Sequence, residues 1–241
     1  MRETKNKTLS VTLVPERDLK EFSLCNNNIL AAVFYGNNTS ISLSQDYLRV
    51  PVSLPQVGEE PLVEVWVSDL PNEVNQFENI YYAANSEMVF GSINFRETKT
   101  DGLDKLAFRA YKEILSFLDR MEFPFLARCW NYFPDINLES NGIERYKLFC
   151  SGRHEAFLKK YQSMHGYLPA ASAVGSQSGP LTINFIAARN CTGEHIENPR
   201  QVSAYKYPTS YGEHSPSFAR ATYIDWGESK YLYVAGTASI I

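Results

Sequence analysis

The sequence predicts an α+β fold in which helices cover one face of a mixed β-sheet. Short β-prone runs alternate with two segments of helical periodicity, in the order β-β-α-β-α-β-β over residues 79–188. The chain has 241 residues, which is long enough to bury a sizeable core. Hydrophobic residues make up 44% of the chain and charged residues 21%, as in ordinary globular proteins.

Residues 1–78 are predicted to form a strand-rich extension that precedes this unit. Leu9–Val14, Ile29–Tyr35 and Leu62–Val67 are short β-prone runs, with polar punctuation between them. Prolines between Pro51 and Pro71 argue against a helix in that stretch. No side-chain pattern there suggests chemistry, so we expect a scaffolding role.

Residues 79–190 form the predicted central unit. Asn79–Phe95 has the pattern of a β-hairpin, with a polar turn between an aromatic and an apolar strand. From Leu103 to Met121, apolar residues recur with a 3.6-residue period, which predicts an amphipathic helix that ends before Pro124. Phe125–Phe133 is the next predicted strand.

A second helix is predicted from Gly142 to about Gln162, followed by strands at Ala170–Val174 and Leu181–Ala188. Strand patterns then return at Ala221–Ile224 and Tyr231–Ala238 and repeat the character of the earlier hairpin. We therefore expect residues 191–241 to hold a tyrosine-rich loop and the start of a second unit, either cut short or completed by another chain. The alternative is that the last strand closes the first sheet.

Composition excludes several classes of protein. A net charge of −4 gives no basic surface for nucleic-acid backbones. No apolar run approaches the roughly 20 residues of a membrane span, so no membrane association is expected. The polar N-terminus lacks the apolar core of a signal peptide, and four widely spaced cysteines are typical of reduced thiols. These features predict a cytoplasmic protein.

The second predicted helix carries an arginine on its apolar stripe. Tyr146, Phe149, Cys150, Arg153 and Phe157 fall at i, i+3, i+4, i+7 and i+11. A buried guanidinium requires a partner, because an unpaired buried charge is costly. Helical periodicity leaves two partners open, an internal carboxylate or a bound anion. The guanidinium fork is suited to holding a carboxylate through two hydrogen bonds.

A long polar segment from Asn198 to Arg220 is the second candidate for a binding region. It contains Arg200 and Lys206 together with several tyrosines, and prolines interrupt it. Long loops rich in aromatic residues and hydrogen-bond donors are often functional, and tyrosines suit a small cyclic polar ligand. The alternative is a solvated loop with incidental tyrosines.

Neither a metal nor a cofactor is expected. Two Cys-x-x-x-His pairs, Cys150/His154 and Cys191/His195, offer four soft ligands, but their spacing matches no zinc finger or knuckle. A cysteine–histidine nucleophile has equally little support. The glycines are scattered, without a P-loop or a dinucleotide fingerprint.

Together the motifs resemble the chorismatases. The resemblance runs from Tyr81 to Ile241 and rests on five segments in family order. They are Arg128–Asn137, Glu144–Arg153, Leu168–Ala173, Glu197–Tyr205 and Ser215–Ala221. Chorismatases are built from two YjgF/RidA-like halves, and they hydrolyse chorismate or convert it to hydroxybenzoates with release of pyruvate. The resemblance implies this fold and chorismate as the small-molecule substrate.

The resemblance also implies a set of substrate-binding residues. Tyr146 and Arg153 match a tyrosine and an arginine that bind a substrate carboxylate. Tyr205 and Arg220 match further contacts. Ala238 matches a position that helps to partition products, and alanine there is similar to the branch that makes a dihydroxycyclohexadiene carboxylate.

Cleavage of the enolpyruvyl ether requires a proton donor for its methylene carbon, and a carboxylic acid with a raised pKa would serve. In the family this acid is a glutamate near the end of the second half, which this sequence does not reach, so no catalytic residue is assigned. We expect either a truncated enzyme, or an oligomer or complementing chain that supplies the acid. The alternative is a non-catalytic RidA-like protein that binds small anions or acts in assembly.

Overall fold

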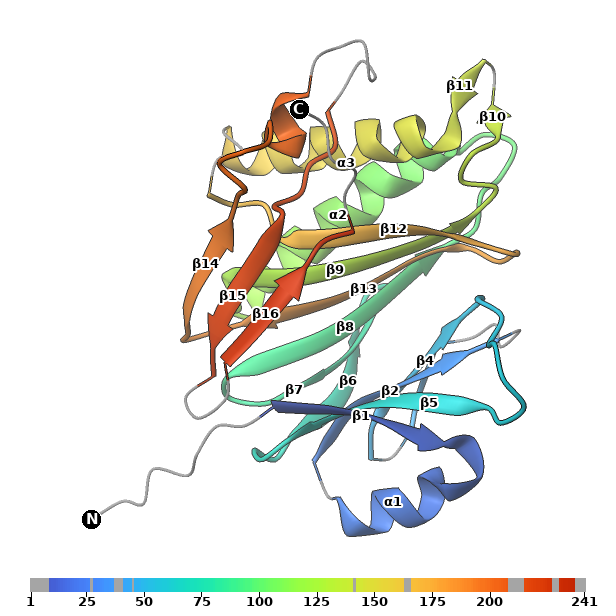
Figure 1. Ribbon diagram of the computed structural model, residues 1–241, viewed down its shortest axis with the longest axis vertical. Coiled ribbons are helices and arrows are strands. Elements are labelled where there is room, and N and C mark those ends of the chain that lie inside the picture. The colour runs from blue at the N-terminus through green and yellow to red at the C-terminus, as the bar shows by residue number, and fades with distance from the viewer. Residues whose placement is uncertain are drawn as a thin grey trace.

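The computed structural model describes residues 9–26, 28–36, 41–44, 46–140, 142–162, 166–207, 215–226 and 230–236. Helices α2 and α3 lie on one face of a central sheet, and an N-terminal sheet with the short helix α1 lies on the other face (Figure 1). A small third sheet stands beside the edge of the central sheet. The predicted α+β class is confirmed.

The central sheet is mixed, with the strand order β12-β9-β13-β8-β7-β6. Strand β12 runs parallel to β9, and the other neighbours are antiparallel. The predicted hairpin and the three later strands are confirmed, whereas β6 was not predicted. The strands are β6 (Glu73–Phe77), β7 (Ile80–Ala84), β8 (Met88–Phe95), β9 (Phe125–Pro134), β12 (Ala170–Ser176) and β13 (Leu181–Ala188).

Both long helices form where the periodicity predicts them. Helix α2 spans Leu103–Arg120 and α3 spans Arg145–Tyr161. Helix α3 begins three residues later than predicted, because β10 (Glu139–Ser140) and β11 (Ile143–Glu144) form a small hairpin before it. The two helices meet at Gly152, where an added Cβ would lie 1.9 Å from the carbonyl oxygen of Asp104. This close approach sets the depth at which α3 lies over the core.

The N-terminal sheet covers the face of the central sheet that the helices leave open. Its order is β1-β5-β2-β4-β3. Helix α1 (Leu19–Cys25) was not predicted, because seven residues with one buried leucine give no periodic signal. The strands are β1 (Leu9–Pro15), β2 (Ile29–Tyr35), β3 (Ser42–Leu43), β4 (Leu48–Val52) and β5 (Leu62–Ser68).

Aromatic packing joins these two sheets, and a half-buried carboxylate braces the N-terminal one. The Trp66 ring lies 5.3 Å from Phe90 and 5.5 Å from Trp130, both in the central sheet. Trp66 Nε1 donates to Glu64 Oε1 at 2.7 Å, and Tyr35 Oη donates to Glu64 Oε2 at 3.0 Å. The core is therefore continuous across both sheets. The domain boundaries at residues 78 and 190 stay predictions.

The third sheet consists of β14 (Thr192–Ile196), β15 (Ala221–Asp225) and β16 (Lys230–Val234), all antiparallel. Strand β14 was not predicted. Strand β16 pairs with β15 rather than with the central sheet, so the alternative in which it closes the first sheet is wrong. Among the described residues, none of the helices combines the length and apolar character that a membrane crossing requires.

Candidate active site

A cavity of about 120 Å³ lies between α3, β12 and the segment that leads into β15. Tyr146, Cys150 and Arg153 of α3 form one wall, and Ser172 of β12 and Ser217 form part of the opposite side. The resemblance singled out Tyr146 and Arg153, and the fold brings both to this cavity. Ala238 lies outside the described residues.

Arg153 is buried, with 3% of its surface exposed. Its Nε and Nη2 atoms are buried without a hydrogen-bond partner among the described residues. The same part of the chain contains no carboxylate in an ion pair with it. Its guanidinium carbon lies 4.7 Å from the ring centroid of Tyr111 and 5.4 Å from that of Phe157. Of the two partners left open by the sequence, an internal carboxylate is not paired with Arg153 among the described residues, which favours a bound anion.

The other polar groups on the α3 wall are uncharged at neutral pH. Burial raises the pKa of the Tyr146 hydroxyl well above its ordinary value, and the neighbouring Cys150 raises it further. Burial also raises the pKa of the Cys150 thiol to about 12. A protonated thiol is a poor nucleophile, whereas a neutral tyrosine hydroxyl can donate a hydrogen bond to an anion.

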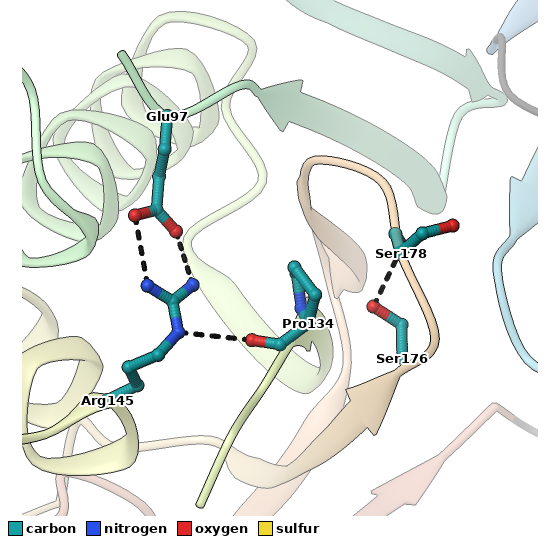
Figure 2. A network of polar contacts seen from close by, with 5 residues as sticks. All are labelled: Glu97, Pro134, Arg145, Ser176 and Ser178. Atoms are coloured by element: carbon teal, nitrogen blue, oxygen red, sulfur yellow. Dashed lines mark hydrogen bonds and ion pairs between the residues drawn. The ribbon is translucent and has the colours of Figure 1, made fainter. Parts of the chain in front are cut away.

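Ion pairing at the start of α3 places Tyr146 at the cavity. Arg145 makes a two-pronged pair with Glu97, in which Nη1 donates to Oε2 at 3.0 Å, and its Nε donates to the carbonyl oxygen of Pro134 at 3.2 Å (Figure 2). The backbone N–H of Tyr146 donates to the carbonyl oxygen of Ile136 at 3.0 Å. These contacts tie the first turn of α3 to the ends of β8 and β9.

Arg220 and Tyr205 lie outside the residues that line this cavity. Arg220 is 7% exposed, and its Nη2 donates to Tyr207 Oη at 2.6 Å and to the Val202 carbonyl at 3.0 Å. Tyr205 is half-buried against the core instead. Sequence reasoning therefore missed Tyr207, the tyrosine that contacts Arg220. Tyr207 also adds to the raised pKa of Tyr146, which burial chiefly causes, so the two hydroxyls share one electrostatic environment.

Sequence reasoning also missed a second buried arginine. Arg128 of β9 is 6% exposed, and its Nη2 donates to Ser172 Oγ at 2.6 Å. Burial lowers the pKa of Arg128, and the positive charge of Arg153 lowers it further. Guanidinium groups nevertheless stay charged in proteins. The apolar neighbours of Arg128 in its predicted strand are the signal that could have indicated a buried guanidinium in need of a partner.

Comparisons with known proteins identify the family of the chain. The family model described as chorismatase FkbO/Hyg5-like, N-terminal, matches residues 64–187. A 3-hydroxybenzoate synthase from Streptomyces hygroscopicus is 34% identical over 220 residues, which are 89% of this chain and 64% of the relative. A chorismatase from the same organism is 32% identical over 215 residues, or 88% of this chain and 62% of the relative. The chain thus spans less than two-thirds of these relatives.

A solved structure supports the same family. A chorismatase crystal structure at 1.08 Å resolution superposes with a TM-score of 0.88 and 28% sequence identity, over 99% of this chain and 71% of that one. The family model covers about half of the sequence. On these grounds the chain belongs to the FkbO/Hyg5-like chorismatase family.

Proposed function

We propose that this protein binds chorismate and takes part in cleaving its enolpyruvyl ether, with release of pyruvate and a dihydroxycyclohexadiene carboxylate or a hydroxybenzoate. The observation that carries the proposal is the buried guanidinium of Arg153, which has unpartnered nitrogen atoms beside a cavity in a chorismatase-family fold. A substrate carboxylate would supply the two hydrogen-bond acceptors that this guanidinium lacks.

The chemistry of the cavity suits a cyclic dicarboxylate. Arg153 provides charge, while Tyr146 provides a neutral hydroxyl and an aromatic wall. We propose that both contact the same carboxylate. Arg220 and Tyr207 form a neighbouring polar pair that we assign to a second part of the substrate. The roles of Tyr205 and Ala238 stay predictions.

The proton donor is not assigned to a described residue. The cavity lining within the described residues includes no aspartate or glutamate. The thiol of Cys150 and the hydroxyl of Tyr146 have raised pKa values, which make them weaker acids than usual. We therefore propose that turnover depends on a carboxylic acid from outside the described residues, or from a complementing or oligomeric partner chain.

The proposal also includes a YjgF/RidA-like architecture and a cytoplasmic location. We assign the central sheet with α2 and α3 to one YjgF/RidA-like unit, and β14 to β16 to the beginning of a second. The four cysteines are free, Cys25 being exposed and Cys129 and Cys150 buried. Free thiols are typical of reducing compartments, which supports a cytoplasmic enzyme.

The test is an assay of pyruvate release from chorismate by the purified chain, in parallel with calorimetric binding of chorismate. We expect chorismate to bind, and Arg153→Met to weaken binding by about 100-fold or more, because two charge-assisted hydrogen bonds are lost. Arg109→Met on the exposed side of α2 is the matched control. Absence of both binding and pyruvate release would overturn the proposal.

A second function, anion binding without turnover, is favoured by one observation, the absence of a carboxylic acid from the described cavity lining. In that case chorismate and benzoate-type dicarboxylates raise the melting temperature but are not consumed. Adding the carboxy-terminal part of a related chorismatase distinguishes the two. Pyruvate release on addition supports an enzyme that needs complementation, and continued binding without release supports the binding protein.

A further inference from the structure

We propose that Ser172 and Arg128 form a second anion-binding arm of the cavity and make the site selective for ligands with two carboxylates. Ser172 donates its hydroxyl hydrogen to the second carboxylate, and Arg128 is the positioning residue that orients this hydroxyl. The inference deepens the proposed function and rests on it for the identity of the natural ligand.

The hydrogen bond between Arg128 and Ser172 has only one possible direction. The Nη2 atom of Arg128 donates to Ser172 Oγ at 2.6 Å. A guanidinium can only donate, so the serine oxygen acts as acceptor and its own hydrogen is left for another acceptor. No described residue accepts a hydrogen bond from this hydroxyl, and Ser172 lines the cavity. A ligand oxygen in the cavity would complete its hydrogen bonding.

The strand register holds this serine in place. Strands β9 and β12 run parallel, with Ser172 opposite Trp130. The Nδ2 atom of Asn131 donates to the carbonyl oxygen of Ser172 at 2.8 Å, and Asn131 Oδ1 accepts from Tyr111 Oη at 2.6 Å. Both the backbone and the side chain of Ser172 are thus fixed from β9. A donor that is fixed before the ligand arrives loses little entropy on binding.

The charges of Arg128 and Arg153 give a second reason to expect a ligand with two carboxylates. Arg128 Nη1 is buried without a hydrogen-bond partner, and the residues described by the structure include no ion-paired carboxylate for Arg128. The guanidinium carbon of Arg128 also lies 5.3 Å from the ring centroid of Trp130. Arg153 on α3 likewise has buried guanidinium nitrogen atoms without hydrogen-bond partners among the described residues. One carboxylate would neutralise one of these two buried charges, whereas a dicarboxylate would neutralise both.

The test measures selectivity rather than activity. Dissociation constants for isophthalate, which has two carboxylates, and benzoate, which has one, are measured by calorimetry for the whole chain, with chorismate as a third probe. We expect the wild type to prefer isophthalate over benzoate. Ser172→Ala should weaken isophthalate binding about 10- to 100-fold, the value of one hydrogen bond to a charged group, and change benzoate binding less than twofold. Ser172→Thr keeps the hydroxyl and should retain the preference.

Arg128 is tested through its coupling to Ser172. Arg128→Lys keeps the charge but loses the fork, and it should reduce the preference for isophthalate. The double variant with Ser172→Ala should lose little more than Ser172→Ala alone, because both changes remove one arm. If Arg128→Lys fails to fold, the inference is tested by comparing the isophthalate preference of Ser172→Ala with that of Ser172→Thr.

Two results would overturn the inference. One is a wild-type protein without preference for isophthalate, and the other is a Ser172→Ala variant that weakens both probes equally or neither. Failure of chorismate to bind, while the isophthalate preference persists and depends on Ser172, would instead refute the proposed function and leave this inference standing.

Discussion

Replacing Arg153 by methionine should leave the stability of the unliganded protein nearly unchanged and abolish its response to the ligand. Methionine keeps the length and apolar stem of the side chain but removes a buried charge whose Nε and Nη2 lack partners among the described residues. Replacing buried charges by apolar residues of similar volume is often stabilising, by about 1–4 kcal/mol. The variant also loses the contacts with Tyr111 and Phe157, each worth about 0.5–2 kcal/mol.

These two contributions are of similar size, so the free energy of unfolding should change by no more than about 2 kcal/mol in either direction. For a chain of this size, that limit corresponds to a shift of at most about 8 °C in the melting temperature. Chorismate should raise the melting temperature of the wild type and leave that of Arg153→Met unchanged.

The assay is thermal unfolding with and without chorismate, together with urea denaturation to obtain the free energy. Arg109→Met, which removes an exposed arginine of α2 paired with Glu113, serves as control and should keep the ligand-induced shift. A variant less stable than the wild type by more than about 2 kcal/mol, with its ligand response intact, would show that Arg153 is a structural residue. The anion-site reasoning would then be refuted.

Three further predictions concern the scaffold around the site. Gly152→Ala should lower the urea midpoint by the equivalent of about 2–3 kcal/mol, because its Cβ would overlap the Asp104 carbonyl; an unchanged midpoint would mean that the helices can separate freely. Burial lowers the pKa of His195 to about 4, so the unfolded chain binds a proton first as the pH falls from about 6.5 to 4. Stability should fall in that window by up to about 3 kcal/mol more than in His195→Gln, as measured by denaturation at each pH; parallel profiles would contradict the burial argument. Glu97→Gln should weaken chorismate binding several-fold by loosening Arg145 and the first turn of α3, and an unchanged dissociation constant would show that the pair does not position the site.

Periodicity predicted the parts of the fold that repeat a pattern over many residues. Helix α2 (Leu103–Arg120) has a long apolar stripe, and strand β13 (Leu181–Ala188) is a mostly apolar run between turn signals. The elements that were missed are short. Helix α1 (Leu19–Cys25) has two turns at most, and β14 (Thr192–Ile196) carries glycine and charge among its five residues. Such segments gain their structure from neighbours distant in sequence.

The two buried arginines differ in how visible they are in the sequence. Arg153 stands out because an amphipathic helix has one buried face, so a charge on that face is conspicuous. Arg128 does not, because β9 (Phe125–Pro134) is covered by helices on one face and by the N-terminal sheet on the other. A strand buried on both faces loses the alternation that distinguishes inside from outside. Only the assembled fold reveals that its arginine is enclosed.

The partner of Arg153 could not be predicted from local pattern either, since any of the chain's 27 acidic residues could have reached it. The described fold instead brings a second cation, Arg128, into the same electrostatic environment. Two enclosed guanidiniums without ion-paired carboxylates in the described region oppose folding of the unliganded chain. Such an arrangement is stable only because the continuous core around it supplies the missing free energy. Binding of an anion with two charges would remove that cost, so affinity for the ligand and instability of the empty site have the same physical origin.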